Sequence, residues 1–193
     1  LPRHLASFRR DYPGIEVEVS VSNAALNLTK READVALRIG NKPPESLVGR
    51  RVGRLVFAVY GARGCRARRP QKELEKHDWI GFDSEHAALA RRFSEFLPGV
   101  QSVYRVNSVA AALAAAAAGV GLAPLPCGIA DREALLERLC DLPDSFTLDL
   151  WLLTHEDLRR TARIRAFMDF MAEALAGEAA LLEGRRPEAW REL

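Results

Sequence analysis

The stretch Asn107–Pro126 reads NSVAAALAAAAAGVGLAPLP, and its order of residue types predicts a helix followed by a strand. Ser108 offers a hydroxyl group at the N-cap of a helix over Val109–Ala118, and Gly119 suits the C-cap. The apolar run Val120–Leu125 then predicts a short buried strand. A helix that leads directly into a buried strand is typical of an α/β fold.

The same region could in principle be a transmembrane helix, because Val109–Ala130 carries no charge and is long enough to cross a bilayer. Most of the run is alanine, which contributes little transfer free energy, and Pro124 and Pro126 end any helix. We therefore expect no contact with a membrane.

Outward from this stretch, apolar strands alternate with helical segments, which predicts mostly parallel strands in an α/β fold. The long extended segment Leu47–Tyr60 separates two such runs and indicates two lobes. The strands are expected at Ile15–Val21, Asp34–Gly40, Leu47–Tyr60, Trp79–Phe82, Ser102–Val106 and Leu148–Leu153. The helices are expected at Leu1–Asp11, after Asn23, after Ser84, at Val109–Ala118, at Asp131–Leu142 and from Asp157 onward.

Two helix starts are candidate ligand sites, since free N–H groups at a helix N-terminus attract anions at the carboxyl ends of strands. One is Asn107 with Ser108, and the other is Ser22 with Asn23. Each pattern also fits an ordinary N-cap without a ligand. Asp34 and Arg38 share a strand face, which fits either an internal ion pair or a position in a cleft between the lobes.

Composition excludes several classes of protein. The chain has 193 residues, 48% of them hydrophobic, with a formal net charge of +2, so it can build a core but has no general attraction for polyanions. The arginines in Arg50–Arg69 favour a solvated face over phosphate binding. The three cysteines are widely spaced, which favours reduced thiols in a cytoplasm.

Catalytic and metal-binding signals are also missing from the sequence. The four histidines lack the spacing of metal ligands, and neither a nucleophile elbow nor a phosphate-binding loop is present. We expect a protein that is not an enzyme and that needs no metal or cofactor.

An ordered set of motifs resembles the effector-binding (substrate-binding) domain of LysR-type transcriptional regulators. The set covers roughly residues 1–176 in the family's order and spacing. Its members are LASFRRDYPGIEV at Leu5–Val17, READVALRIG at Arg31–Gly40, LVGRRVG at Leu47–Gly53, Asn107–Ser108 before the alanine-rich helix, AGVGLAPLP at Ala118–Pro126, Leu150–His155, and the helix around Ala166–Phe170.

The resemblance implies two Rossmann-like lobes joined by two crossover strands, as in type II periplasmic binding proteins. The crossovers would lie near Val56–Tyr60 and Leu150–Thr154, with lobe I at 1–59 plus 155–193 and lobe II at 60–154. Family members sense a small-molecule effector between the lobes and pair as a homodimer, with tetramers of the full-length protein binding promoter DNA. The chain begins with Leu1 rather than Met, so we expect it to be cut from a longer protein that carries the N-terminal helix-turn-helix.

The resemblance and the helix starts together define an expected effector site, and we expect its ligand to be anionic. Arg38 is the expected counter-charge. The family's first strand, with the turn after it, would complete the site but precedes Leu1. The alternative is a periplasmic solute-binding protein for transport, which shares the fold. The expected contacts are Ser22, Asn23 and Arg38 from the first lobe and Gly81, Asn107, Ser108, Leu125 and Pro126 from the second.

Overall fold

The computed structural model describes residues 1–21, 33–40, 43, 45–65, 71–83 and 87–185. The chain forms two compact units, one from residues 1–54 and 148–179 and the other from residues 55–147 and 180–193. It therefore passes between the units three times, whereas the sequence suggested two crossings. The lobe boundaries expected from the sequence, 1–59 with 155–193 and 60–154, remain a prediction.

The first unit is built on a three-stranded sheet in the order β1-β8-β2. Strands β1 (Val35–Ile39) and β8 (Leu148–His155) form where the sequence predicts strands, but they run antiparallel to each other. Strand β2 (Leu47–Leu55) lies on the other side of β8. A Cβ atom on Gly49 would lie 2.1 Å from the carbonyl oxygen of Leu152, so the approach of β2 to β8 requires glycine at this position.

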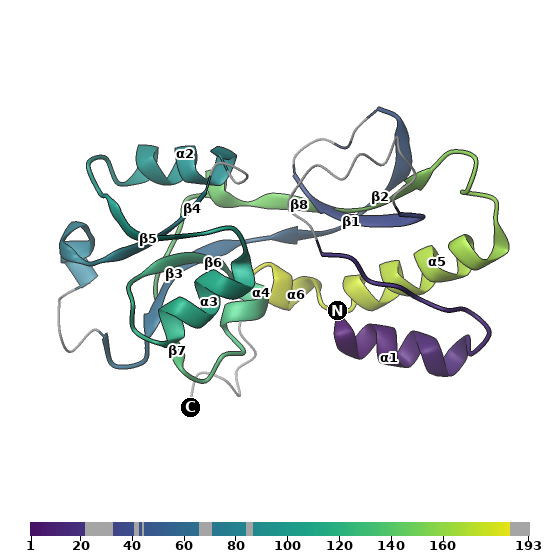
Figure 1. Ribbon diagram of the computed structural model, residues 1–193, viewed down its shortest axis with the longest axis horizontal. Helices are drawn as coiled ribbons and strands as arrows, with labels where there is room; N and C mark the ends of the chain where they lie inside the picture. The colour runs from purple at the N-terminus through teal and green to yellow at the C-terminus, as the bar shows by residue number, and fades with distance from the viewer. Residues whose placement is uncertain (22–32, 41–42, 44, 66–70, 84–86, 186–193) are drawn as a thin grey trace. The chain divides into compact units, whose positions relative to one another are not determined.

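Helices α1 (Pro2–Asp11) and α5 (Ala162–Ala176) pack side by side in this unit (Figure 1). Phe8 is fully buried between them, with its ring centroid 5.0 Å from that of Phe167 and 5.3 Å from that of Phe170. Both contacts are edge-to-face, the geometry that aromatic quadrupoles prefer. The opening helix predicted from the sequence is therefore confirmed, while α5 begins at Ala162 rather than at Asp157.

The strand expected at Ile15–Val21 is wrong, since these residues form no strand in the described structure. Val17, Val19 and Val21, the apolar side of the alternation, are all exposed. An alternating pattern defines two faces, but a strand forms only when a neighbouring backbone takes its hydrogen bonds. No described segment pairs with these residues.

The second unit has β3 (Phe57–Ala62) in the middle of a sheet with the order β6-β3-β7. Strands β6 (Ala123–Pro126) and β7 (Leu136–Asp141) both run antiparallel to β3. Strands β4 (Trp79–Phe82) and β5 (Ser102–Val106) form a parallel pair. A bridge between Trp79 and Leu122 joins β4 to the segment that leads into β6. The expectation of mostly parallel strands is wrong, since β1 with β8, β3 with β6 and β3 with β7 are antiparallel pairs, whereas β4 with β5 is parallel.

Strand β7 corrects the helix expected at Asp131–Leu142. Leu136 and Leu139 are buried, but Leu135, assigned to the same helical face, is 62% exposed. The edge of β3 opposite β6 has backbone N–H and C=O groups that need hydrogen-bond partners, and β7 supplies these partners. A register shift between Val59 and Tyr60 breaks the simple alternation of β7, and this is why the apolar spacing resembled that of a helix.

Helices surround the strands of the second unit as the α/β pattern predicts (Figure 1). Trp79 and Phe93 pack together in the core, where their ring centroids lie 4.6 Å apart. No helix in the described ranges is long and apolar enough to cross a membrane. The helical elements are η3 (Gln71–Lys76), α2 (Ala87–Phe96), α3 (Val109–Ala117), α4 (Cys127–Ala130), η5 (Asp144–Phe146) and α6 (Ala179–Leu182).

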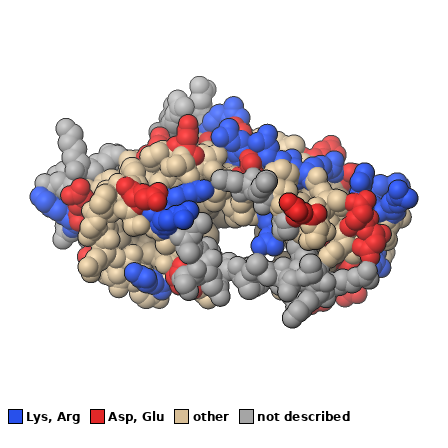
Figure 2. Space-filling view, turned by 90° about the horizontal axis from the view of Figure 1, so that it is seen from above, with Lys and Arg blue, Asp and Glu red and all other residues tan. Residues whose placement is uncertain are grey.

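The surface charge agrees with the small net charge of the sequence. Figure 2 shows basic and acidic side chains interspersed on the face that it displays. Two arginines of β2 are paired with acidic side chains, Arg50 with Asp169 at 2.7 Å and Arg51 with Asp149 at 3.1 Å. Exposed pairs of this kind contribute little to stability, about 0–1 kcal/mol each.

Candidate functional site

The carboxyl ends of β4 and β5 lie together at one edge of the second unit. Phe82 is opposite Val106 in the parallel register, and the N–H group of Asp83 donates to the Val106 carbonyl at 3.1 Å. The structure therefore brings the ends of both strands, with Gly81 and Asn107, to the same edge. In open α/β sheets this edge is where ligands bind.

Helix α3 begins at this edge with the N-cap that the sequence predicts. The Oγ atom of Ser108 accepts a hydrogen bond from the N–H group of Ala111 at 3.2 Å, and the Ser108 backbone is extended (φ −147°, ψ 149°). The first-turn N–H groups of Val109 and Ala110 point out of the helix beyond this cap. Together with the positive end of the helix dipole, they favour a bound anion.

The small side chains of α3 also serve packing, because Ala112 and Ala116 are fully buried against the sheet. Gly119 follows the helix with φ +80°, and the N–H group of Val120 bonds the Ala115 carbonyl at 3.0 Å. This is the Schellman arrangement, in which glycine takes the left-handed position. The cap predicted at Gly119 is confirmed, and it fixes where α3 ends and the path to β6 begins.

Gly81 has a structural reason to be glycine. A Cβ atom at this position would lie 2.2 Å from the Oγ atom of Ser102 on the neighbouring strand. The absence of a side chain therefore allows β4 and β5 to approach each other. It also leaves bare backbone at the edge where Asn107 and Ser108 lie, so a ligand role for Gly81 remains a prediction.

Leu125 and Pro126 are deeply buried on β6, opposite Ala58 and Phe57 of β3. Leu125 has no exposed surface and belongs to the core of the second unit. Pro126 ends the strand and precedes the first residue of α4. The apolar wall expected from these two residues is untested and remains a prediction.

The candidate residues of the first unit are described only in part. Arg38 lies half-buried on β1, opposite Trp151 of β8. The sequence left open an ion pair between Asp34 and Arg38. In the structure Asp34 pairs with Arg163 instead, at 3.6 Å. Ser22 and Asn23 lie outside the described residues.

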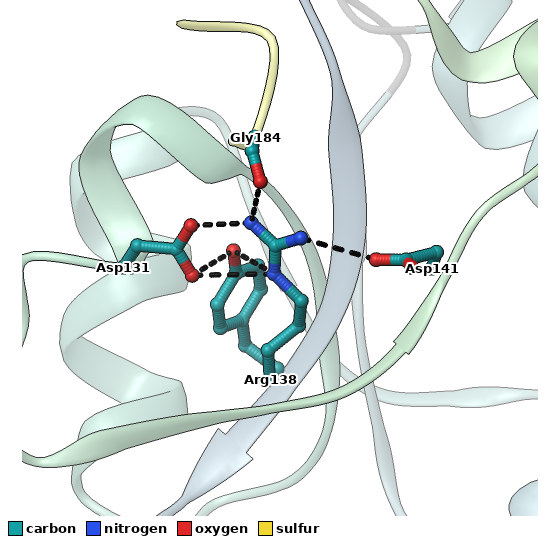
Figure 3. Close-up of polar contacts among 5 residues, drawn as sticks. Asp131, Arg138, Asp141 and Gly184 are labelled. Atoms are coloured by element: carbon teal, nitrogen blue, oxygen red, sulfur yellow. Dashed lines mark hydrogen bonds and ion pairs between the residues drawn. The ribbon is translucent and has the colours of Figure 1, made fainter. Parts of the chain in front are cut away.

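A buried polar cluster around Arg138 in the second unit was not found from the sequence (Figure 3). Its guanidinium group donates to both carboxylate oxygens of Asp131, and at 3.2 Å to the hydroxyl oxygen of Tyr60. It also donates to Asp141 at 3.1 Å and to the Gly184 carbonyl at 3.1 Å. Asp131 and Asp141 are 7 and 3 residues from Arg138, but Tyr60 and Gly184 are 78 and 46 residues away, so no local motif marks the whole cluster.

Protonation in this cluster follows from burial. Burial raises the pKa of the Tyr60 hydroxyl, which donates to Asp131 at 2.8 Å and stays neutral. Burial alone would lower the pKa of Arg138, but the hydrogen bond to Asp131 and the neighbouring Tyr60 and Cys127 raise it. Arg138 therefore stays charged and compensates the buried carboxylate, which identifies the cluster as structural.

Two hollows lie away from the candidate residues. A cavity of about 350 Å³ in the second unit is lined by Cys65, His77 and Val120 among others, at the opposite end of β4 from Gly81. A groove of about 670 Å³ in the first unit is lined by Leu47, Met168 and their neighbours. Within the described ranges, no group of side chains is arranged to hold a metal ion.

Known proteins resemble this chain over most of its length. Residues 1–176 match the family described as "LysR substrate binding domain". The probable HTH-type transcriptional regulator LtrA of Klebsiella pneumoniae is 28% identical over 190 residues, which cover 90% of this chain and 60% of that protein. The chain thus spans less than two thirds of that relative.

Solved structures agree on the fold. The regulatory domain of CrgA from Neisseria meningitidis has a TM-score of 0.75 at 22% identity, over 90% of this chain and 91% of that one. The CcmR regulatory domain of Synechocystis PCC6803, solved in complex with 2-PG, has a TM-score of 0.72 at 20% identity, over 92% and 90%. At such identity the likeness establishes the architecture alone.

Two α/β units, the second with the N-terminus of α3 at the ends of β4 and β5, define a ligand-binding domain with the type II periplasmic-binding-protein-like fold. The chain belongs to the LysR substrate-binding domain family. That family is a ligand-binding domain of transcriptional regulators rather than a class of enzyme. Membership does not favour the transport alternative, and it confirms the resemblance drawn from the motifs.

Proposed function

We propose that this chain is the effector-sensing domain of a bacterial LysR-type transcriptional regulator. It binds a small anionic effector at the edge formed by Gly81, Asn107 and Ser108, within the cleft between the lobes that the family resemblance implies. Arg38 supplies a counter-charge from the first unit, and Ser22 and Asn23 supply polar contacts. Effector binding favours one arrangement of the lobes and so controls DNA binding by the full-length protein.

The observation that carries this proposal is the N-terminus of α3. Ser108 satisfies the N–H group of Ala111, so the N–H groups of Val109 and Ala110 are available at the ends of β4 and β5. Two such donors and the helix dipole select for a carboxylate or phosphate group. The bound ligand of the Synechocystis relative supports a sensing role for this fold, without identifying the effector here.

The remaining parts of the proposal concern the whole regulator. Promoter DNA is contacted by a helix-turn-helix domain outside this chain, as the names of the relatives suggest. The domain pairs as a homodimer, full-length copies form tetramers, and the protein works in the cytoplasm, where its promoters are. Because Arg50 and Arg51 of β2 pair with Asp169 and Asp149, we assign these two arginines no role in DNA binding.

A thermal-shift panel tests the proposal. The purified chain is heated with carboxylates, dicarboxylates, aromatic acids and phosphate monoesters, each beside its neutral amide or alcohol. A ligand at 100 times its dissociation constant stabilises a protein by about 2.7 kcal/mol, which corresponds to about 5–10 °C for a domain of this size. We expect at least one anion to reach that shift, and its neutral analogue to have no effect.

Two variants with the same change of charge locate the response. Arg38→Gln should reduce the shift produced by the best anion, whereas Arg9→Gln on the exposed surface of α1 should leave it unchanged. Equal thermal shifts in the two variants would show that Arg38 does not contribute to binding the anion. A panel in which neutral analogues stabilise the chain as much as anions do would contradict an anionic effector.

A further inference from the structure

The groove of about 670 Å³ in the first unit is lined by residues other than those of the proposed effector site. Its walls are the first half of β2, the end of β8 and the first two turns of α5, together with Pro43 and Arg159. All of these residues belong to the first unit. The volume of the groove is in the range of about 300–1,000 Å³ that is typical of sites for small molecules.

Apolar side chains make up one part of the groove lining. Leu47 and Leu153 belong to the core of the first unit, with 6% and 1% of their surface exposed. Val48 and Met168 also line the groove but are only half-buried, so part of each side chain is accessible from it. A hydrocarbon group in the groove would remove this apolar surface from water, which is favourable in proportion to the area covered.

The charged part of the lining consists of three arginines and one acidic residue, Asp169. Arg50 is already bound within the protein, since its guanidinium group donates to Asp169 at 2.7 Å and to the Met168 carbonyl at 2.9 Å. These contacts join β2 to α5 across the groove. Arg159 and Arg165 therefore supply the excess positive charge of the lining.

The side chains of Arg159 and Arg165 are accessible to an anion from solution. Arg159 is 65% exposed, and its ion pair with the equally exposed Glu156 is long, at 3.7 Å. Within the part of the chain that the structure describes, the Arg165 side chain has no hydrogen bond or ion pair. Because exposed ion pairs are weak, a carboxylate in the groove can replace Glu156 with little loss of free energy.

We propose that this groove is a second ligand site of the domain and that it binds a medium-chain organic carboxylate. The carboxylate group pairs with Arg159 and Arg165, whose planar guanidinium groups suit its two oxygen atoms. The hydrocarbon chain covers Val48 and Met168. Since every residue of the groove belongs to the first unit, this site is independent of the proposed effector site, and either proposal can fail alone.

Methyl NMR with octanoate as the probe tests the site, because the two methionines of the chain differ in position. Met168 lines the groove, whereas Met171 on the next turn of α5 is 1% exposed and lies outside the lining. Octanoate should shift the Met168 methyl signal in a saturable manner and leave the Met171 signal nearly unchanged. Butyrate should bind at least about tenfold more weakly, because it has four fewer methylene groups to cover the apolar surface.

Two double variants with the same change of charge locate the carboxylate group. Arg159→Gln combined with Arg165→Gln should weaken octanoate binding at least about fivefold. Arg160→Gln combined with Arg163→Gln is the matched control, because these exposed neighbours lie outside the groove lining. The control should bind octanoate within about twofold of the unchanged chain. Circular dichroism should be the same for both variants, since all four side chains are exposed.

Several results would overturn the proposal. The first is the absence of a saturable shift at Met168. The second is binding of the uncharged 1-octanol as tightly as octanoate, or equal weakening in the two double variants, because the arginines would then not select the ligand. The third is a Met168 signal that changes with protein concentration in the absence of ligand, which would show that a second copy of the chain occupies the groove.

Discussion

Replacing Val109 by proline removes one hydrogen-bond donor from the proposed effector site while keeping helix α3. Val109 is the first residue of the helix, where proline is well tolerated because its fixed φ angle suits the first turn. The preceding residue, Ser108, is extended (φ −147°, ψ 149°), which is the conformation that a following proline requires. Val109→Ala is the matched control, since it loses the side chain but retains the N–H group.

The size of the effect follows from the donor that is lost. A hydrogen bond to a charged group contributes about 1.5–3 kcal/mol, which corresponds to roughly a 10- to 150-fold change in the dissociation constant. The Ser108 cap to Ala111 is unaffected, so the unfolding free energies of the two variants should agree within about 1 kcal/mol. The binding loss in the proline variant is therefore separate from any loss of helix stability.

Isothermal titration calorimetry with the best anion of the thermal-shift panel measures this loss. The alanine variant should bind close to the affinity of the unchanged chain, and the proline variant at least about tenfold more weakly. Equal affinity in the two variants would show that the N–H group of Val109 does not contact the anion. The reasoning from the α3 N-terminus would then be refuted, whatever the identity of the ligand.

Three further predictions concern stability and are measured by urea unfolding. Phe8→Ala should cost about 3–5 kcal/mol, because the ring is fully buried between two helices; a cost below about 1 kcal/mol would contradict that packing. Gly49→Ala should cost about 2 kcal/mol or more, since its Cβ atom meets the carbonyl of Leu152, whereas Gly14→Ala meets nothing within 4 Å and should change little. Burial raises the pKa of the Cys127 thiol above its ordinary value of about 9, so the thiol keeps its proton to a higher pH in the folded chain than in the unfolded chain. Stability is then intact below about pH 9 and falls by up to about 1.4 kcal/mol per pH unit above it, a slope that Cys127→Ala should reduce.

The parts of the fold that were predictable depend on local patterns. The cap at Ser108, the left-handed Gly119 and the short apolar runs that form β1, β4 and β8 are all properties of neighbouring residues. Strand Ile15–Val21 shows the limit of such patterns, because alternation cannot show whether a pairing partner is present. Val21, the last apolar residue of that alternation, is 89% exposed.

The Arg138 cluster was missed for a related reason. Arg138 was assigned to a helix, and its partners Tyr60 and Gly184 are 78 and 46 residues away in sequence. The pairing of β7 with β3 brings Arg138 opposite Tyr60, and the segment after α6 brings the Gly184 carbonyl to the same guanidinium group. The buried arginine and aspartate had no local signature, since each residue alone is typical of a solvated surface.

Of the expected effector contacts, Gly81, Asn107 and Ser108 lie at one edge because β4 and β5 are parallel, and the carboxyl ends of parallel strands meet at the same edge. Their contact with an effector is part of the proposal. The contribution of Arg38 depends on the arrangement of the two units, which no local pattern determines. It therefore remains part of the proposal.

The central claim, that an anion binds at the N-terminus of α3, is tested most directly by amide NMR during titration with the best anion of the panel. We predict that the largest shifts occur at the amides of Val109 and Ala110, with smaller changes at Gly81 and Asn107. Shifts confined to the residues around Cys65 and His77, which line the separate cavity at the other end of β4, would contradict the claim.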